Sequence, residues 1–481
     1  MMKNISLYLL IAILPFLSGC NKETKSRKKP PNVLFIAIDD LNNWIRLLDD
    51  DAPITTPHLE ELAQKGMLFT KAYAPSASCN PSRVAILTGM RPSTTGVYGN
   101  KSNWKKALPD VVTIPEYFKQ EDYKVMGAGK IFHHHWNGAF HDSSAFDDFQ
   151  HMPWLPDSPM PEEKLNGFEW YGSPNTDWGI WPEDEGQQHL DQRTTAYVVD
   201  KLDSKHSKPF FLAAGIFRPH MPFFAPADAF EKYPEDLDEV QMPEVNWNDW
   251  DDIPSGAEKM VGKEWLWNGM MKADSIRPGA WKEAVRAYQV CATFADKQIG
   301  KIIAALKKSP YAENTIIVLW SDHGFHLGEK EHWEKFALWE KTTQVPFIVV
   351  APGVTQPGTV YESPVNLLDI YPTLLDLCGF EETPELDGKS LVNVLKDPEY
   401  ERNRPSLMTY GKGNHAIRTD RWRYIHYKDG TEELYDHRND PREWNNLAGD
   451  DQYENLKDSL KQWLPKTEAD SVPDMKRPED L

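Results

Sequence analysis

Four continuous apolar runs constrain the fold of this chain more than any other feature. They occupy residues 32–38, 210–217, 316–320 and 347–350. A run that is apolar at every position is typical of a strand buried on both faces, as in a parallel sheet covered by helices. Helical patterns lie between the runs, at residues 57–65, 114–120, 281–308 and 367–377. The alternation predicts an α/β fold with a large, mostly parallel sheet sandwiched between helices.

The pattern changes from about residue 405. Short alternating segments follow at residues 416–418, 422–427 and 433–435, separated by turn residues such as Asp429-Gly430. They predict a small antiparallel sheet, then a helix near residues 453–464 and a polar, disordered tail after Pro465. The 481 residues are enough for one large domain and an appendage. We therefore expect a main domain at residues 32–400 and a smaller C-terminal α+β domain at residues 401–481.

The N-terminus has the pattern of an export signal. Lys3 precedes an apolar run at residues 5–17, which ends in Leu17-Ser18-Gly19-Cys20. The run is too short for a stable transmembrane helix and looks like the signal peptide and lipobox of a bacterial lipoprotein. We expect a signal peptide at residues 1–20, a lipid anchor on Cys20 and a flexible tether at residues 21–31. The mature protein would then be periplasmic or attached at the cell surface; a plain cleaved secretory signal is the alternative.

Charge and cysteine content narrow the function classes. The chain has 73 acidic and 53 basic residues, a formal net charge of −20. This balance opposes binding to nucleic acid, so an anionic substrate needs a local positive pocket. The four cysteines do not form a disulfide framework, because Cys20 belongs to the lipobox and Cys79 to a motif described below. Cys291 and Cys378 lie in apolar helical patterns, which favours buried free thiols.

A long irregular segment at about residues 140–188 is rich in Pro, Trp, Asp and Gly. Insertions of this length are usually functional loops or disordered, and we expect this one to shape a substrate pocket. Trp170, Trp178 and Trp181 lie in it. Such tryptophans suit stacking on sugar rings, but packing under long loops explains them equally well.

Polar residues follow directly after three of the apolar runs. Asp39-Asp40 follows the first, Arg218-Pro219-His220 the second and Ser321-Asp322-His323 the third. Open α/β sheets place their ligand sites at the carboxyl ends of the strands. We therefore expect these groups to meet at one edge of the sheet.

The most specific motif is Cys79-Asn80-Pro81-Ser82-Arg83, followed by an apolar stretch that ends in Leu87-Thr88-Gly89. Pro81 and the apolar periodicity after it predict a helix that begins just after Cys79. The positive end of its dipole would face residue 79 and favour an anion there. The motif resembles the C-x-P-x-R signature of the type I sulfatases, which belong to the alkaline-phosphatase-like superfamily. The resemblance implies that a maturing enzyme oxidises Cys79 to formylglycine.

The resemblance covers most of the chain and is strongest to the iduronate-2-sulfatase branch. It implies a calcium site formed by Asp39, Asp40, Asp322, His323 and the modified Cys79. Three carboxylates suit a hard divalent cation, since Ca²⁺ prefers oxygen ligands. A histidine is an unusual calcium ligand, yet Asp-His at this position is what the iduronate branch has.

The resemblance also implies roles for the remaining polar groups. Lys130 and Lys335 would bind the sulfate, together with Arg83. His133 would contact the hydrated formylglycine, and His220 would donate a proton to the departing alcohol. His134 and His135 follow His133 directly, and only the family pattern separates the three.

These assignments imply a sulfatase that acts on sulfated oligosaccharides, with 2-O-sulfated uronic acid or xylose as the leading sugar. Glycosaminoglycans and algal ulvan are both compatible sources. A phosphonate or phosphodiester hydrolase of the same superfamily and a glycan-binding surface lipoprotein without catalysis are the alternatives.

Overall fold

The computed structural model describes residues 30–133, 143–150, 161–182, 189–262, 266–381, 383 and 385–475. The predicted signal peptide and most of the tether lie outside these residues. No helix among them is both long and apolar enough to span a membrane.

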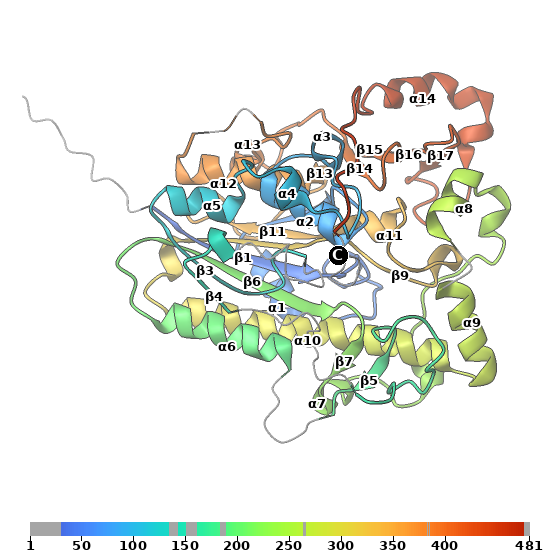
Figure 1. Ribbon diagram of the computed structural model, residues 1–481, viewed down its shortest axis with the longest axis horizontal. Coiled ribbons are helices and arrows are strands. Elements are labelled where there is room, and N and C mark those ends of the chain that lie inside the picture. Colours follow the sequence, from blue (N-terminus) through green and yellow to red (C-terminus); the bar gives the residue numbers. More distant parts are fainter. Residues whose placement is uncertain are drawn as a thin grey trace, which may run out of the picture.

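The described residues contain a nine-stranded sheet (Figure 1). Its strands, in spatial order, are β12 (Thr359–Tyr361), β2 (Met67–Tyr73), β11 (Gln344–Val350), β8 (Thr315–Ser321), β1 (Asn32–Asp39), β6 (Phe210–Pro219), β3 (Lys124–Gly129) and β4 (Asp148–Gln150), with β13 (Val365–Asn366) also paired to β2. β1 pairs in parallel with β6 and β8, and β3 with β6 and β4. β11 runs antiparallel to both of its neighbours, which the sequence did not predict. The predicted α/β fold with a mostly parallel sheet is confirmed.

Alternate side chains of β1 belong to two hydrophobic cores, one on each face of the sheet. Leu34, Ile36 and Ile38 lie in the first core, and Val33 and Phe35 in the second. Because both faces are covered, every residue of β1 is buried, as its continuous apolar run predicted.

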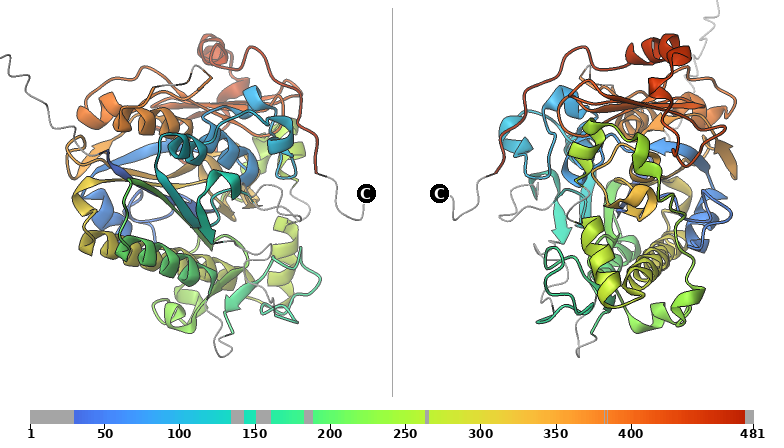
Figure 2. Two further views of the ribbon diagram at one scale, coloured as in Figure 1. Left: turned by 60° about the vertical axis from the view of Figure 1, so that its left-hand side comes forward. Right: turned by 90° about the vertical axis from the view of Figure 1, so that its right-hand side faces the viewer.

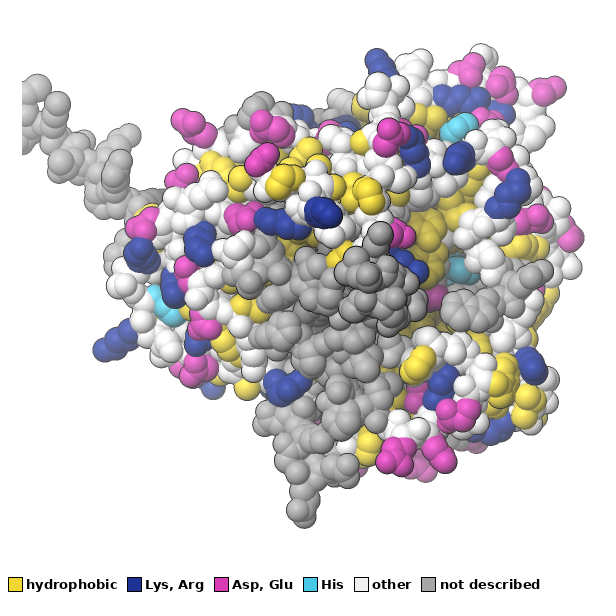
Figure 3. All heavy atoms as spheres, in the orientation of Figure 1, with side chains coloured by type: hydrophobic (Ala, Val, Ile, Leu, Met, Phe, Trp, Pro, Cys, Tyr) yellow, Lys and Arg dark blue, Asp and Glu magenta, His cyan; other side chains and the backbone are white. Residues whose placement is uncertain are grey.

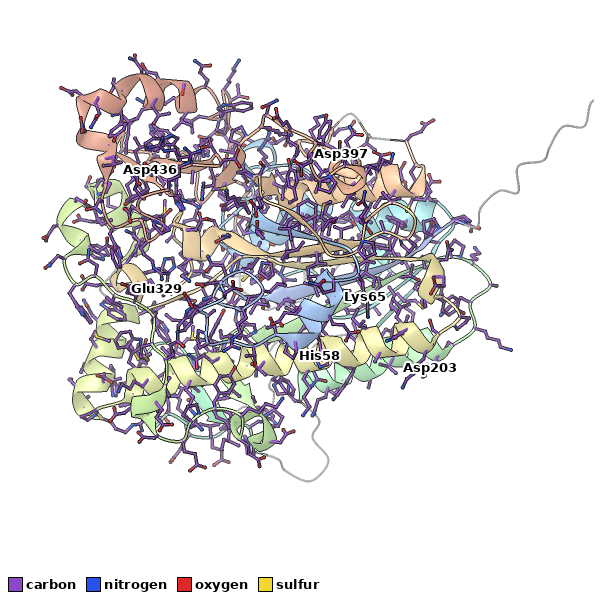
Figure 4. All side chains as sticks on the ribbon, turned by 180° about the vertical axis from the view of Figure 1, so that it is seen from behind. His58, Lys65, Asp203, Glu329, Asp397 and Asp436 are labelled. Carbon is purple, nitrogen blue, oxygen red and sulfur yellow. The ribbon has the colours of Figure 1, made fainter. Side chains whose placement is uncertain are left out.

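Two groups of helices cover these faces (Figure 1). The first face is covered by α1 (Pro57–Ala63), α6 (Leu190–Asp203) and α10 (Ala280–Lys308). The second is covered by α2 (Cys79–Thr88), α5 (Ile114–Gln120), α12 (Ile370–Cys378) and α13 (Val392–Lys396). On the first face α1 lies directly against α10: a Cβ on Gly300 would come within 2.4 Å of the His58 ring, which Figure 4 shows from behind. Cys291 is buried in α10 and Cys378 is half-buried at the end of α12, and neither forms a disulfide.

A separate four-stranded antiparallel sheet lies near the C-terminus, as predicted. It consists of β14 (Ser406–Thr409), β15 (His415–Arg418), β16 (Trp422–His426) and β17 (Glu432–Asp436), and α14 (Glu454–Lys461) packs beside it. The sequence pattern predicted β15 to β17 and the helix but missed β14.

Buried charges join this sheet to the main domain. Glu340 begins α11 (Glu340–Thr343) and forms ion pairs with Arg418 and Arg423. Arg423 Nε lies 2.6 Å from Glu443 Oε1, and His437 Nε2 lies 2.9 Å from the same oxygen. We call Tyr73, Glu340, Arg418, Arg423, His437 and Glu443 the C-terminal cluster.

The polar tail is not disordered over residues 466–475, which corrects the prediction. Backbone N–H groups of Ala469, Val472 and Met475 donate to carbonyls of the segment 93–101. Val472 and Met475 are each 8% exposed, within the core on the second face of the sheet. Figure 2 shows the tail descending from α14 along this segment. Two well-spaced apolar side chains and backbone pairing are sufficient to fix a polar segment.

The irregular insertion is described at residues 143–150 and 161–182. It contains β4 and β5 (Trp178–Ile180), which pairs with β7 (Phe223–Ala225). Trp178 and Trp181 are buried, so the packing interpretation holds for them, whereas Trp170 is 46% exposed.

The remaining elements are short or peripheral. They are α3 (Pro92–Thr95), α4 (Trp104–Ala107), α7 (Ala227–Phe230), α8 (Ser255–Val261), α9 (Leu266–Ile276), β9 (His326–Leu327) and β10 (Trp333–Glu334).

Candidate active site

The predicted strand-end residues meet at one edge of the sheet. β8, β1 and β6 are adjacent, so the residues after them are neighbours in space. The backbone N–H of Asp40 donates to Asp322 Oδ1 over 3.1 Å, which ties the ends of β1 and β8 together. Asp40 has a φ of 62°, a conformation that is uncommon for a residue with a side chain and that recurs at functional sites.

Cys79 lies at the centre of this edge. It is the first residue of α2, all of whose residues are buried. Its Sγ lies 3.1 Å from His323 Nε2 and 3.3 Å from Lys335 Nζ. The backbone N–H of Asn80 donates to the side chain of Asn100, so that N–H group is not available to a bound anion.

Two sets of metal-competent side chains share Cys79. One contains Asp40 and His323, and the other contains Asp39 and Asp322. Within each set one donor atom per residue lies within 4.8 Å of the others, and all of these residues are buried. The structure therefore brings together the five side chains that the sequence named as metal ligands.

The carboxylates of the site hold Arg83. Its Nε lies 2.7 Å from Asp322 Oδ2 and an Nη lies 3.1 Å from Asp39 Oδ1. It also donates to the backbone carbonyls of Lys130 and Ile131. The guanidinium thus joins the ends of β1, β3 and β8 and orients two of the carboxylates.

Lys130 follows β3 and forms an ion pair with Asp39. Two glycines allow its backbone to cross close to β6. A Cβ on Gly215 would lie 2.3 Å from the Lys130 carbonyl carbon, and one on Gly129 would lie 2.0 Å from the Gly215 oxygen. Gly129 also has a φ of +76°, which favours glycine.

The other predicted residues that the structure describes lie at the same edge of the sheet. Lys335 Nζ lies 2.9 Å from Asp40 Oδ1, and His133 forms a hydrogen bond with Cys79. His220 Nε2 lies 3.9 Å from Asp40 Oδ2 on the more exposed side of the site. His134 and His135 lie outside the described residues.

Burial and neighbouring charges shift several pKa values at this edge. Burial opposes ionisation of the Cys79 thiol, but Lys130, Lys335 and His323 together hold its pKa well below the ordinary value. Burial also opposes a charge on His323, yet Asp322 and Cys79 raise its pKa to about 9. For Asp322 burial prevails over Arg83 and raises the pKa to about 6. Such perturbed groups, gathered in one place, are typical of active sites.

Tyr288 of α10 also supports the site, although its sequence context did not predict this role. The Tyr288 hydroxyl donates to the Asp40 carbonyl over 2.8 Å and accepts from the Asn42 N–H. It therefore fixes the backbone directly after β1. Its apolar neighbours in α10 gave no signal that its hydroxyl faces the site.

Comparisons with known proteins agree with this geometry. The Sulfatase family model matches residues 31–380, and the model of the N-sulphoglucosamine sulphohydrolase C-terminal region matches residues 328–470. A sulfatase of Formosa agariphila is 40% identical over 96% of this chain and 92% of its own length. Human iduronate 2-sulfatase is 28% identical over 82% of this chain and 80% of its own length.

A solved structure shares the fold with a TM-score of 0.72, 21% identity and coverage of 90% of this chain and 96% of its own. It is described as a complex with the substrate D-glucosamine-2-N,6-O-disulfate. The family match extends over most of the chain, and the strand ends converge on Cys79. This chain therefore belongs to the sulfatase family of sulfuric ester hydrolases.

Proposed function

We propose that this protein is a calcium-dependent sulfatase whose nucleophile is formylglycine made from Cys79, and that it removes sulfate from sugars. The observation that carries the proposal is the position of Cys79 Sγ, which lies between two sets of metal-competent groups and within 3.3 Å of Lys335 Nζ. In the mature enzyme the oxygen atoms of formylglycine would stand near the position of this sulfur.

Members of the family generally use formylglycine and a divalent metal ion, and the residues present fit such an ion. Asp39, Asp40 and Asp322 are buried carboxylates in close proximity, an arrangement that is costly without positive charge. Their oxygen donors match the preference of Ca²⁺. Asp39, Asp40, Asp322 and His323 would hold the ion together with the modified residue 79. The ion would supply positive charge beside the sulfate group.

Three cations of the chain complete the charge balance. Lys130 and Lys335 would bind sulfate oxygens, while Arg83 keeps Asp39 and Asp322 in place. Hydrated formylglycine supplies two hydroxyl groups on one carbon, one to attack sulfur and one to expel the sulfate afterwards. Preorganised charges of this kind lower the barrier most where charge develops in the transition state.

His220 is suited to donate the proton to the departing sugar alcohol. Its Nδ1 lies 2.5 Å from the Met221 carbonyl oxygen, which can only accept, so Nδ1 carries a hydrogen. The proton that is exchanged therefore sits on Nε2, the nitrogen on the Asp40 side. General acid catalysis by a positioned imidazole contributes about 10²- to 10⁴-fold to a rate.

We propose 2-O-sulfated uronic acid or xylose as the leading substrates, in oligosaccharides from glycosaminoglycans or ulvan. Human iduronate 2-sulfatase, a relative over most of the chain, supports a sulfated sugar. Purified protein with formylglycine at position 79, verified by mass spectrometry, should release sulfate from such oligosaccharides. The Cys79→Ala variant should release none, and turnover by that variant would overturn the mechanism.

The same assay separates a phosphodiester or phosphonate hydrolase from a sulfatase. Matched sulfate and phosphate esters should be compared, and faster turnover of the phosphate ester would favour the alternative. A persistent thiol at residue 79 in protein isolated from its native host would favour a glycan-binding lipoprotein without catalysis.

We further propose that the protein is exported and anchored by a lipid on Cys20, and that a formylglycine-generating enzyme matures it. The support is the Leu17-Ser18-Gly19-Cys20 sequence and the Cys79 motif. Cys20→Ala should move the protein from the membrane fraction to the soluble fraction. An unchanged membrane fraction would contradict the lipid anchor.

A further inference from the structure

The segment 328–336 has an unusual backbone that places Lys335 against Cys79. Gly328, Lys330, Glu331, Glu334 and Phe336 all have positive φ angles. A run of such angles outside glycine is rare and is sustained only where the surroundings determine it. Lys335 is 3% exposed, whereas both of its neighbours, Glu334 and Phe336, remain half-buried. The segment thus buries the Lys335 side chain among the charged groups around Cys79 and leaves Glu334 and Phe336 at the edge of that group.

Glu334 directly precedes Lys335 in the chain, and its carboxylate lies near the charged groups of the site. Its carboxylate interacts electrostatically with Lys335, Asp40, His220 and Cys79. It makes no hydrogen bond or ion pair with any side chain in the part of the chain that the structure describes. Burial raises its pKa to about 7. A carboxylate that is partly removed from water and lacks donors is stabilised by any ligand that brings one.

Two stacked aromatic rings belong to the same region as Glu334. Phe336 stacks on Tyr410 with ring centroids 5.7 Å apart, and both residues are half-buried. Tyr410 directly follows β14, so the C-terminal sheet contributes to the rim of the site. Its phenol interacts electrostatically with Glu334 and Lys335. Figure 3, in the orientation of Figure 1, shows that hydrophobic side chains are exposed in a hollow of the face beside α8.

An aromatic surface beside a single hydrogen-bond acceptor suits a sugar ring, which has an apolar face and donating hydroxyl groups. The same acceptor opposes a second carboxylate, because like charges in a poorly solvated site repel each other strongly. Lys335 does not remove this bias, since its ammonium group already pairs with Asp40.

We propose that Glu334, Phe336 and Tyr410 form a specificity wall that selects a sulfated neutral sugar over a sulfated uronic acid. A hydroxyl group of the sugar donates to Glu334 while the ring packs on the two aromatic side chains. The inference rests on the proposed sulfatase function and chooses between its two leading sugars.

Xylosides and glucuronosides test the proposal, because the two sugars differ only by the carboxylate on C5. Three pairs should be compared, with sulfate on O2, O3 or O4, using enzyme that contains formylglycine. Assays at about pH 8 keep Glu334 ionised, one unit above its pKa. We expect kcat/KM for the preferred xyloside to exceed that for its glucuronoside by about tenfold or more.

The variant Glu334→Gln removes the charge but preserves the size and the backbone conformation. We expect the xyloside-to-glucuronoside ratio to fall by about fivefold or more, mainly through faster turnover of the glucuronoside. Glu331→Gln is the matched control, because it makes the same change in the same segment, and it should leave the ratio unchanged. Melting temperature and formylglycine content should be measured for all three proteins.

The outcomes separate this inference from the proposed function. Sulfate release from both sugars at equal rates, or a ratio that Glu334→Gln leaves unaltered, overturns the specificity wall and leaves the sulfatase function standing. Release from neither sugar at any position overturns both. Tyr410→Phe, which keeps the stacked rings, should preserve the ratio, whereas Tyr410→Ala should raise KM for the xyloside; an unchanged KM also counts against the wall.

Discussion

Two buried clusters of charged side chains flank the segment 335–340, and they differ in how their carboxylates are neutralised. In the cluster around Cys79 three aspartates share two lysines and one arginine, and burial raises the pKa of Asp322 to about 6. In the C-terminal cluster two glutamates face two arginines.

Both clusters contain groups spaced as in a metal site, with Glu340, His437 and Glu443 as the second example. The arginines already neutralise those glutamates. Although burial opposes ionisation, Arg418 and Arg423 hold the pKa of Glu340 well below its ordinary value. Glu340 pairs with two arginines and Glu443 with one of them, whereas Asp39 and Asp322 share the single guanidinium of Arg83. The comparison teaches that spacing alone does not identify a metal site. A better sign is a carboxylate, such as Asp322, that its cations leave incompletely stabilised beside a reactive side chain.

The largest effect should come from removing the reactive side chain. Cys79→Ala should lower kcat/KM by about four orders of magnitude or more, because the nucleophile is lost. Cys291→Ala, which removes a second buried cysteine, should keep the activity. The measurement is sulfate release together with the urea midpoint of both variants. If both variants lost comparable activity, Cys79 could not be distinguished from a structural cysteine such as Cys291.

Breaking the C-terminal cluster should affect stability instead. Arg423→Met leaves Glu340 and Glu443 short of a buried cation and should lower the free energy of unfolding by about 3–5 kcal/mol. Sulfate release per folded molecule should change by less than about threefold, since Arg423 is remote from Cys79 in the ion-pair network. Urea unfolding and active-site titration are the two readouts. Lost activity in fully folded protein would contradict the assignment.

The reverse experiment targets Lys335. Lys335→Met should lower kcat/KM by about 10²- to 10³-fold, the range for one electrostatic group at a transition state. Its effect on the free energy of unfolding should be smaller than that of Arg423→Met, because a bound cation can offset the charge of Asp40. If the two variants destabilise the protein equally, the clusters do not differ as described.

Calcium should bind to one cluster and not to the other. At a concentration about 100-fold above the dissociation constant, Ca²⁺ should stabilise the protein by about 2.7 kcal/mol. Asp322→Asn should abolish this shift in melting temperature, and Glu443→Gln should preserve it. Chelation with EDTA should reverse it in the wild type. A shift that depends on Glu443 would place the ion in the C-terminal cluster.

The smallest expected effect is the loss of stability at low pH that depends on Glu443. Burial alone would raise the pKa of Glu443, but Arg423 and His437 lower it below the ordinary value of a glutamate. A lowered pKa stabilises the fold above the unfolded value of about 4.3, and this stabilisation is lost as the pH falls further. Below that pH the wild type should therefore lose stability more steeply than Glu443→Gln, as measured by urea unfolding. Parallel profiles would exclude Glu443 as a contributor.

Much of the fold could be predicted because the central strands are apolar at every position. A strand that is apolar at every position gives no information on whether it runs parallel or antiparallel to its neighbours. The sequence of β11 therefore did not indicate that it runs antiparallel. The strand-end aspartates could be placed at one edge from sheet topology alone, without any side-chain geometry.

Other features depend on contacts between distant residues, which a single sequence does not reveal. The family pattern named Lys335, but nothing indicated the positive φ angles around it or the half-buried Glu334 beside it. The family pattern assigned Arg83 to the sulfate, and only the packed structure reveals that Asp39 and Asp322 hold it. The tail was predicted to be disordered because its residues are polar, whereas backbone hydrogen bonds with residues 93–101 fix its position.

The close crossing of Gly129 and Gly215 makes the chemistry sensitive to positions that carry no functional group. A single methyl group at residue 215 would force the chain apart at Lys130. Alanine is ordinarily the mildest of replacements. At residue 215 it would lower the activity because it would displace the Lys130 ammonium group without removing it. A screen for inactive variants that looked only at polar residues would overlook this pair.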